Sequence, residues 1–491
     1  MLAPAVATGH NAAMFRVRTN LRGLVPLHGI AASRALEQRA AATLPAHALM
    51  QRAGLAVARL ALALAPHARS VWLACGPGNN GGDGFEAAAH LQRWGKAPVV
   101  TVLDAVQGVP LDAAAAHRRA VEAGVRFADA PPDTFDLAID ALFGLGAARP
   151  LDGVALRWRD AMRARGVPVL AVDLPSGLDA DTGMGEPVIA SHTLSLLTLK
   201  PGLFTGRGRD ACGEVWMDDL GVAADGEPTA WLNAPVARPA RPHASHKGSW
   251  GDVAVIGGAQ GMAGAALLAG TAALHSGAGR VFVGLLDRGS LGVDPCEPGL
   301  MFRAAAALPV QDLHVACGCG GGQAVRELLP RVLSAARSLV LDADALNAIA
   351  SDEALQRLLR ARGAREGDST VLTPHPLEAA RLLGCDAHAV QADRLAAAQR
   401  LCAAYGCVVV LKGSGTIIAA PGQRPRINPT GNARLATAGT GDVLAGMIAA
   451  RMAEGLPGWT AACDAVHRHG QVADEWPGLQ SLTASALARA G

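Results

Sequence analysis

The chain has 491 residues, half of them hydrophobic and 18% charged, so it can bury large cores and is not disordered as a whole. Its formal net charge of +2 argues against nucleic acid or an acidic membrane surface as a partner. Nine scattered cysteines without a CxxC pair argue against a disulfide framework or a zinc cluster and favour a reducing compartment, the cytoplasm.

The first 27 residues predict an extension ahead of the first domain. They contain arginines at positions 16, 18 and 22 but no apolar run followed by a cleavage site, so they do not resemble a signal peptide. The most apolar stretch of the chain, residues 53–68, is interrupted by Arg59 and is too short to span a bilayer. We therefore expect no membrane association.

Apolar runs typical of strands alternate with helical stretches in both halves of the chain. The runs cover residues 71–76, 98–103, 137–144, 167–177, 252–258, 280–286, 339–346 and 407–413. This alternation predicts βαβ units whose parallel sheets are covered on both faces. Residues 231–245 carry three prolines and no periodicity, which indicates a linker. The sequence thus predicts two α/β domains, over 28–230 and 246–491.

A glycine-rich sequence, CGPGNNGGDG at 75–84, follows a predicted strand and opens a predicted helix. Its glycines fit the GxGxxG pattern that is typical of dinucleotide binding. Asn79, Asn80 and Asp83 add oxygen donors at the helix start, which suit a cation such as K⁺ or the hydroxyls and phosphates of a nucleotide. A helix-capping loop is the alternative interpretation, because Asn and Asp also cap helices well.

Two later strands of the first half also end in polar residues. Asp140 ends one strand, and Asp173 and Ser176 follow the end of another. Ligands of open parallel sheets bind beyond the carboxyl ends of the strands, so these loops should converge beside the glycine-rich loop. A strand-end aspartate alone is more often a helix cap, but three converging loops favour a site.

In this order, and preceded by MQRAG, the sequences GPGNNGGDG, DALFGLG, VDLPSGLDADTG and LKPGLFTG resemble the NAD(P)HX epimerase family over residues 28–225. The resemblance implies a Rossmann-like three-layer α/β/α domain with K⁺ held by Asn80, Asp140 and Ser176. It implies Asp173 as the acid/base and a substrate-proximal or structural role for Lys200. The implied substrate contacts are Asn79, Asn80, Gly81, Gly82, Asp83, Gly144, Leu145, Gly146, Ala147, Ala148, Arg149, Pro150 and Asp173.

In the second half, Gly439 to Asp442 read GTGD directly before a helical run. Amides at that helix start would form an anion hole, and Asp442 could take a proton from an attacking hydroxyl, as phosphoryl transfer requires. A turn in which Asp caps the helix is the alternative.

Lys412 is one of only four lysines among 44 basic residues and lies in a glycine turn between strands, where it could face phosphates. His375 lies between two prolines at a strand end.

The motifs HKGSWG, GMAGAALLA, LVLDADALN, TPHPLEA, LKGSGT and NPTGN…AGTGD resemble the NAD(P)H-hydrate dehydratase family over residues 243–486, which implies a ribokinase-like α/β fold. The resemblance implies that the adenine nucleotide contacts Lys412, Gly413, Ser414, Gly415, Thr416 and Gly441. It implies that the hydrated cofactor contacts Ala265, Gly320, His375 and Asp442, with Asp442 as the catalytic base. ADP with Mg²⁺ is the expected co-substrate.

This chain departs from the dehydratase pattern at three places: residues 316–322, residues 432–435, and Thr440, where Ser is commoner. ACGCGGG at 316–322 stands where a GPGLG-like turn is usual, which weakens the assignment of Gly320. Arg434 adds a charge near the predicted anion hole, where it could hold phosphate or crowd it.

Together the two resemblances predict a bifunctional NAD(P)H-hydrate repair enzyme acting on NADHX, NADPHX and ADP, and we expect a homo-oligomer. One alternative is a small-molecule kinase of ribokinase-like fold fused to a nucleotide-binding scaffold. Another is a catalytically silent first half that only stabilises an oligomer.

Overall fold

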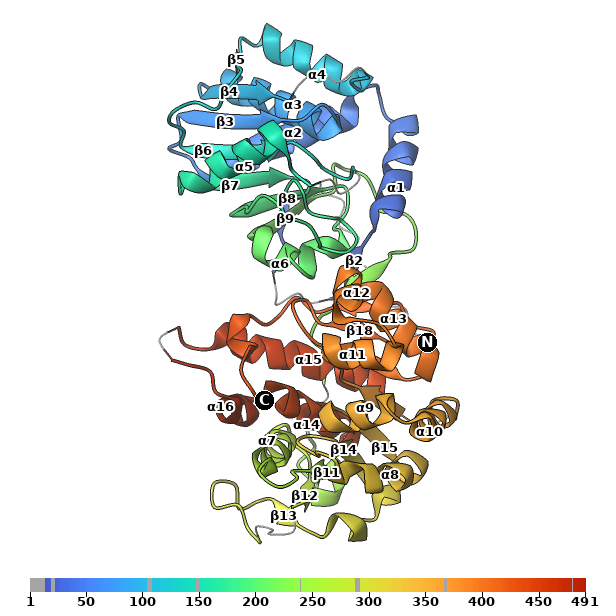
Figure 1. The fold of residues 1–491 in the computed structure, drawn as a ribbon. Coiled ribbons are helices and arrows are strands. Elements are labelled where there is room, and N and C mark those ends of the chain that lie inside the picture. The colour runs from blue at the N-terminus through green and yellow to red at the C-terminus, as the bar shows by residue number, and fades with distance from the viewer. Residues whose placement is uncertain are drawn as a thin grey trace. The chain divides into compact units, whose positions relative to one another are not determined.

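The computed structural model describes residues 14–18, 23–103, 108–146, 150–238, 240–287, 292–365, 369–478 and 480–491. The chain divides into two compact units, one containing residues 26–229 and the other residues 230–491 (Figure 1). Each unit is built on a mixed but mainly parallel sheet with helices between the strands, which confirms the predicted α/β class.

The sheet of the first unit has the strand order β1-β9-β8-β7-β6-β3-β4-β5, and β1 is antiparallel to β9 while the other pairs are parallel. The strands are β1 (Phe15–Arg16), β3 (Ser70–Cys75), β4 (Ala97–Val102), β5 (Arg126–Ala128), β6 (Leu137–Ala141), β7 (Val169–Val172), β8 (His192–Leu196) and β9 (Glu214–Asp218). The helices are α1 (Ile30–Thr43), α2 (Ala48–Leu64), α3 (Asn79–Arg93), α4 (Leu111–Glu122), α5 (Gly153–Ala164), η1 (Pro201–Phe204) and α6 (Gly208–Ala211).

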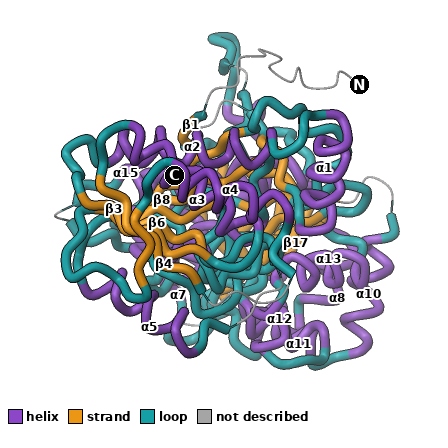
Figure 2. The backbone as a smooth tube through the Cα atoms, turned by 90° about the horizontal axis from the view of Figure 1, so that it is seen from above, coloured by secondary structure: helices purple, strands orange, loops and turns teal. Residues whose placement is uncertain are grey.

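Alternate residues of β3 point into two different cores. Val71, Leu73 and Cys75 pack with α2, α3 and α4, whereas Trp72 packs with Trp158 of α5 on the other face. Figure 2 shows α5 and the α2–α4 group on opposite sides of these strands. Because strand side chains alternate with a period of two, a strand that is apolar throughout must be covered on both faces, and the unit therefore has three layers.

The sheet of the second unit has the order β13-β12-β11-β14-β15-β16-β17-β18-β19-β10-β2 and is parallel from β13 to β17. Its strands are β10 (Ala230–Leu232), β11 (Asp252–Gly257), β12 (Arg280–Leu285), β13 (Met301–Phe302), β14 (His314–Cys317), β15 (Ser338–Leu341), β16 (Ser369–Leu372), β17 (Val408–Leu411), β18 (Ile417–Ala419) and β19 (Arg426–Ile427). The strand order also includes β2 (Val25–Leu27), of which only Val25 belongs to this unit. Strand β18 is antiparallel to both of its neighbours.

The helices of the second unit cover its sheet, and α7, α14, α15 and α16 share one core with the strands. The α-helices are α7 (Ala263–His275), α8 (Leu329–Ala335), α9 (Ala343–Ala350), α10 (Glu353–Gly363), α11 (Pro376–Leu383), α12 (Ala387–Ala392), α13 (Arg394–Tyr405), α14 (Thr440–Ala453), α15 (Gly458–Glu475) and α16 (Ala484–Ala490). The short 3-10 helices are η2 (Lys247–Trp250), η3 (Ala305–Ala307), η4 (Val310–Asp312), η5 (Ala324–Glu327) and η6 (Ala433–Leu435).

Two short strands lie where the sequence predicts an extension and a linker. Strand β2 falls within residues 1–27, and β10 overlaps the start of the segment 231–245. Leu232 of β10 is fully buried and pairs with Ile427 of β19, so this part of the predicted linker belongs to the second sheet.

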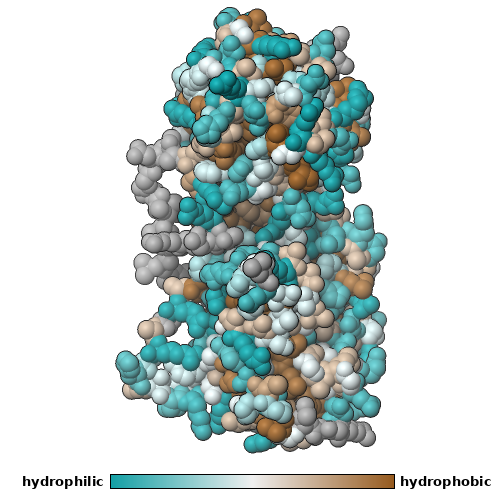
Figure 3. Space-filling model, turned by 90° about the vertical axis from the view of Figure 1, so that its left-hand side faces the viewer, coloured by the Kyte–Doolittle hydropathy of each residue, from teal (hydrophilic) through white to brown (hydrophobic). Residues whose placement is uncertain are grey.

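Among the described helices, none has the length and apolar content needed to cross a membrane. Hydrophobic residues on the face shown in Figure 3 form separate patches among hydrophilic ones.

Candidate functional sites

A pocket of about 480 Å³ lies at the carboxyl ends of the central strands of the first unit. Seven of the residues implied as substrate contacts line it: Asn79, Asn80, Asp83, Gly144, Leu145, Gly146 and Asp173. Ala147, Ala148 and Arg149 lie outside the described residues. Pro150 is exposed and does not line this pocket. The glycine-rich loop and two further strand ends therefore meet at one place, as the sheet topology requires.

Gly81 and Gly82 do not line the pocket, although they lie in the glycine-rich motif. A Cβ atom on Gly81 would lie 1.9 Å from the carbonyl oxygen of Gly76, and one on Gly82 would lie 2.6 Å from Sδ of Met50. Both glycines thus allow helix α3 to pack closely against the preceding loop and against α2. Their observed contribution is to packing.

Asp173 is buried at the end of β7 and has φ 67°, a left-handed conformation that Asp tolerates better than most residues. Its Oδ1 accepts a hydrogen bond from the backbone N–H of Leu196 at 3.1 Å and from the ammonium of Lys200. Lys200 is completely buried and also donates to the carbonyl oxygen of Leu196 at 2.8 Å. The carboxyl group of Asp173 is therefore held in one orientation, and the ammonium of Lys200 lies beside it.

Asp140 lies fully buried at the end of β6. Its two oxygens accept hydrogen bonds from the hydroxyl and the backbone N–H of Ser176, at 2.6 and 2.8 Å. Burial raises the pKa of Asp140 to about 6, although these hydrogen bonds oppose the shift. The Nδ2 of Asn80 has no partner among the described residues, and a Cβ atom on Gly144 would lie 3.0 Å from Oδ1 of Asn80. The carboxylate, hydroxyl and amide oxygens form a hard donor set that fits an alkali cation.

Two residues that the sequence analysis did not select, Arg34 and Glu37 of α1, also line the first pocket. Burial raises the pKa of Glu37, and the nearby charge of Asp173 raises it further. Burial likewise raises the pKa of Asp83, with a further contribution from Asp173. The pocket is thus lined by four carboxyl groups, those of Glu37, Asp83, Asp112 and Asp173. Glu37 lies in an ordinary helical stretch outside every motif, so no sequence pattern identified it.

A second pocket, of about 370 Å³, lies at the carboxyl ends of β15, β16 and β17 in the second unit. Five of the residues implied as contacts line it: His375, Lys412, Gly413, Gly441 and Asp442. Ser414, Gly415, Thr416, Ala265 and Gly320 do not line it. A Cβ atom on Gly320 would lie 2.9 Å from Cβ of Ala265, so these two residues lie against each other. Arg434 is absent from this lining as well.

The start of α14 is where the sequence predicts an anion hole. Gly439 caps the helix with φ 93°, a conformation that favours glycine. The backbone N–H groups of Gly441 and Asp442 have no hydrogen-bond acceptor among the described residues. A Cβ atom on Gly441 would lie 3.1 Å from Nζ of Lys412, so the ammonium lies beside these amides. Free helix-start amides next to a lysine favour the binding of phosphate.

Lys412 forms an ion pair with Asp342, and its Nζ lies 2.6 Å from Oδ1. Burial lowers the pKa of Lys412, but the charges of Asp342 and Glu378 outweigh burial and raise it overall. Oδ1 of Asp342 also accepts a hydrogen bond from Oγ1 of Thr373 at 2.8 Å. The lysine is therefore protonated and fixed in position.

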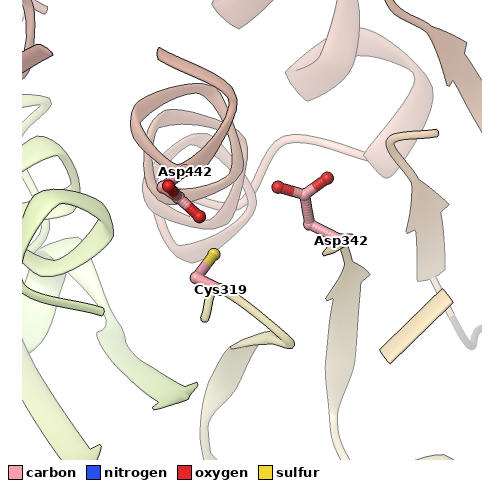
Figure 4. Close-up of side chains that lie close together, drawn as sticks. All are labelled: Cys319, Asp342 and Asp442. Atoms are coloured by element: carbon pink, nitrogen blue, oxygen red, sulfur yellow. The ribbon is translucent and has the colours of Figure 1, made fainter. Parts of the chain in front are cut away.

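Asp442 lies in the first turn of α14 and lines the pocket. Burial and the charge of Asp342 together raise its pKa to about 6, and a hydrogen bond with the thiol of Cys319 opposes the shift. Figure 4 shows the side chains of Cys319, Asp342 and Asp442 pointing toward one another from three different elements. A carboxyl group with this pKa is mostly ionised at neutral pH and can accept a proton.

His375 is the N-cap of α11 and forms a capping box with Glu378. Its Nδ1 accepts hydrogen bonds from the backbone N–H groups of Leu377 and Glu378, at 3.1 and 3.3 Å. Burial and the charge of Lys412 lower the pKa of His375. Burial raises the pKa of Glu378 to about 7. The histidine is therefore neutral at neutral pH, and Nδ1 is its acceptor.

The site residues that the sequence predicts do not include Asp342, Cys319 or Glu378. Asp342 follows the last residue of β15, and this strand-end position was the available signal. Cys319 follows β14 in a segment that departs from the dehydratase pattern, and its proximity to Asp442 is visible only in three dimensions.

Two family models match the chain. Residues 46–202 match the model described as YjeF-related protein N-terminus, and residues 253–489 match the model described as NAD(P)H-hydrate dehydratase. The bifunctional NAD(P)H-hydrate repair enzyme Nnr of Escherichia coli is 36% identical, over 87% of this chain and 84% of the relative. The ADP-dependent (S)-NAD(P)H-hydrate dehydratase of Neisseria meningitidis is 42% identical, over 52% of this chain and 88% of the relative.

Among solved structures, the ADP/ATP-dependent NAD(P)H-hydrate dehydratase of Bacillus subtilis is 31% identical, over 52% of this chain and 91% of that chain, with a TM-score of 0.44. The two family matches occur in the order of the two units. A relative that combines both parts matches most of the chain at more than a third identity. The chain belongs to the family of bifunctional NAD(P)H-hydrate repair enzymes.

Proposed function

We propose that the first unit interconverts the R and S epimers of NADHX and NADPHX in the pocket that Asp173 lines. The reacting carbon, C6 of the hydrated nicotinamide ring, carries both the hydroxyl group and the ring nitrogen. The nitrogen can therefore expel hydroxide, and water can add to the opposite face. Asp173 handles the proton in both directions. Its fixed orientation beside Lys200 supports this role, because a general base must be held within reach of its proton.

In this proposal the hydrated cofactor is bound by Asn79, Asn80, Asp83 and the segment from Gly144 to Pro150.

K⁺ is held by Asn80, Asp140 and Ser176, and it supplies a fixed positive charge near the substrate. The support is the hard oxygen donor set and the complete burial of the Asp140 carboxyl group, whose charge a bound cation would stabilise. Epimerisation should therefore be faster in potassium than in tetramethylammonium salts, and Asp140→Asn should remove the difference. Equal rates of the wild-type protein in both salts would contradict the potassium site.

The second unit dehydrates S-NAD(P)HX to NAD(P)H at the expense of ADP, which gives AMP and phosphate. Asp442 takes the proton of the C6 hydroxyl as that oxygen accepts the terminal phosphoryl group of ADP. Phosphate then leaves with the help of the ring nitrogen, and loss of the C5 proton restores the reduced ring. The amides of the α14 start and Lys412 stabilise the phosphoryl charge. One observation carries this proposal: free helix-start amides, Lys412 and the Asp442 carboxyl line the same pocket.

The nucleotide contacts Lys412, Gly413, Ser414, Gly415, Thr416 and Gly441 in this proposal. The hydrated cofactor contacts Ala265, Gly320, His375 and Asp442. Mg²⁺ would bind with the phosphates and neutralise part of their charge, and the carboxylate of Asp342 is a suitable oxygen ligand. All nine cysteines are free, which supports activity in the cytoplasm.

Asp442→Asn tests the proposed base. The variant keeps the shape of the side chain but cannot accept the hydroxyl proton, so NADH formation from S-NADHX and ADP should fall by roughly 10²–10⁴-fold. Recovery of the reduced-nicotinamide absorbance measures the reaction, and ADP binding should persist. Full dehydration by this variant would exclude Asp442 as the base. Transfer of phosphate to a sugar or vitamin without NADH formation would favour a small-molecule kinase.

A further inference from the structure

Cys319, Asp342 and Asp442 form a compact cluster beside the second pocket. One ligand atom from each, the thiol sulfur and two carboxylate oxygens, lies within 4.8 Å of the others. Figure 4 shows that Cys319 and Asp342 come from the loops after two strands and Asp442 from a helix. The three side chains are thus fixed by separate parts of the unit, as the ligands of a preformed site must be.

The cluster has a free ligand atom and an access route. The hydrogen bonds that Asp342 accepts from Thr373 and Lys412 both fall on Oδ1, so Oδ2 has no donor among the described residues. Asp342 is only 1% exposed and Cys319 is fully buried. Asp342 and Asp442 also line the 370 Å³ pocket, through which an ion can enter. Oδ2 is not one of the buried side-chain atoms that lack a partner, so it is open to the pocket, where an ion can reach it.

We infer that Cys319, Asp342 and Asp442 form a binding site for a thiophilic divalent cation such as Zn²⁺. Tetrahedral coordination with Zn–S of about 2.3 Å and Zn–O of about 2.1 Å puts neighbouring ligand atoms about 3.4–3.6 Å apart, so small side-chain rotations close the site. The thiol loses its proton to solvent when sulfur binds the metal. Water from the pocket fills the fourth position, as in other three-ligand zinc sites.

The charge of the cluster and the types of its ligand atoms both determine which cation it binds. Lys412 balances the charge of Asp342, so the cysteine thiolate and the carboxylate of Asp442 match the two charges of the metal. Sulfur is a poor ligand for Mg²⁺, which requires oxygen in octahedral geometry. The site therefore takes zinc or cadmium in preference to the magnesium that accompanies ADP.

Occupation of this site inhibits dehydration, because a coordinated Asp442 cannot accept a proton. This consequence rests on the proposed role of Asp442, whereas metal binding itself does not. A binding measurement and an activity measurement therefore separate the failure of the site from the failure of the proposed function.

The binding test is a titration of the full-length protein with Cd²⁺ alone, followed by the ultraviolet sulfur-to-cadmium charge-transfer band. The wild-type protein should show this band at one equivalent, and Cys319→Ala and Cys319→Ser should each lose it and bind at least about tenfold more weakly. Cys385→Ala, which removes an exposed thiol, is the matched control and should retain the band. An unchanged band in both Cys319 variants would overturn the inference.

The activity test compares each variant with and without Zn²⁺ at fixed Mg²⁺ and ADP. Zinc should inhibit wild-type dehydration, and the concentration for half inhibition should rise at least about tenfold in Cys319→Ser relative to Cys385→Ala. If cadmium binds through Cys319 but zinc leaves dehydration unaffected, the metal site stands and the role of Asp442 as the base fails. Equal zinc sensitivity of the two variants would place the inhibitory ion elsewhere and overturn the inference.

Discussion

Each pocket is lined by an aspartate that is paired with a lysine, in a chain where only four of 44 basic residues are lysines. Lys200 holds Asp173 in the first unit, and Lys412 holds Asp342 in the second. A compact ammonium group can fit a narrow buried space where the broad arginine fork does not. The rarity of lysine therefore indicated where chemistry lies, but the partner of each lysine is known only from the structure.

Breaking the buried ion pair between Lys200 and Asp173 should cause a large loss of stability, which a second substitution should largely restore. Lys200→Met leaves the Asp173 carboxylate without its cation and should lower the free energy of unfolding by about 3–5 kcal/mol. Adding Asp173→Asn removes the unpaired charge, so the double variant should regain most of this loss. Urea unfolding of the wild-type protein and both variants measures the effect. A single variant as stable as the wild type would show that the pair contributes nothing.

Dehydration should lose activity in mild acid because of Asp442. Burial raises the pKa of this carboxyl from 3.8 to about 6, and only the ionised form can take the hydroxyl proton. The fraction of active base therefore falls as pH drops through about 6, and kcat/KM should decrease about tenfold per pH unit below that value. The measurement is NADH formation from S-NADHX at saturating ADP. A rate that stays level down to about pH 4 would contradict the assignment.

Motifs identified the residues that sit in glycine-rich turns and at strand ends, because these positions need particular residue types. Lys412, His375 and Asp442 all line the second pocket, as the sequence indicated. Glu37 was missed because a single glutamate on a helix carries no local signal. Ser414 to Thr416 belong to the LKGSGT motif but do not line the pocket, so a motif can include residues that lie outside the pocket.

Both pockets lie where parallel strands end and a helix begins. The first uses β6, β7 and the start of α3, and the second uses β15, β17 and the start of α14. Alternating apolar runs predicted these strands, because a strand buried on both faces is apolar throughout. The three-residue strands β2 and β10 were not predicted, since so short a segment has no periodicity and its pairing depends on distant residues.

The start of α14 should tolerate no side chain at Gly441. A methyl group there would lie 3.1 Å from Nζ of Lys412 and would occupy the space of the phosphate. We expect Gly441→Ala to weaken ADP binding by about tenfold, or roughly 1.4 kcal/mol, with little change in the unfolding temperature. Calorimetric titration with ADP measures this.

Gly478→Ala is the matched control, because a Cβ atom at Gly478 has no atom within 4 Å and its φ is not in the left-handed region. It should bind ADP as the wild-type protein does. If Gly441→Ala also binds ADP normally, phosphate does not lie against the start of α14.

Each unit has its own sheet, its own hydrophobic core and its own pocket. The two reactions should therefore be separable by single substitutions. Asp173→Asn should consume S-NADHX but convert the R epimer only as fast as it epimerises spontaneously, and Asp442→Asn should form no NADH at an appreciable rate. Following both epimers by chromatography during incubation with ADP measures each reaction.

A mixture of Asp173→Asn and Asp442→Asn distinguishes release of the S epimer into solution from its transfer within one chain. Each variant keeps one intact pocket, and the S epimer released by one protein can diffuse to the other. An equimolar mixture should therefore consume the R epimer much faster than Asp173→Asn does alone. If the mixture is no faster than Asp173→Asn alone although each intact reaction is normal, the epimer must pass between the two pockets of a single chain, and the units are not independent in catalysis.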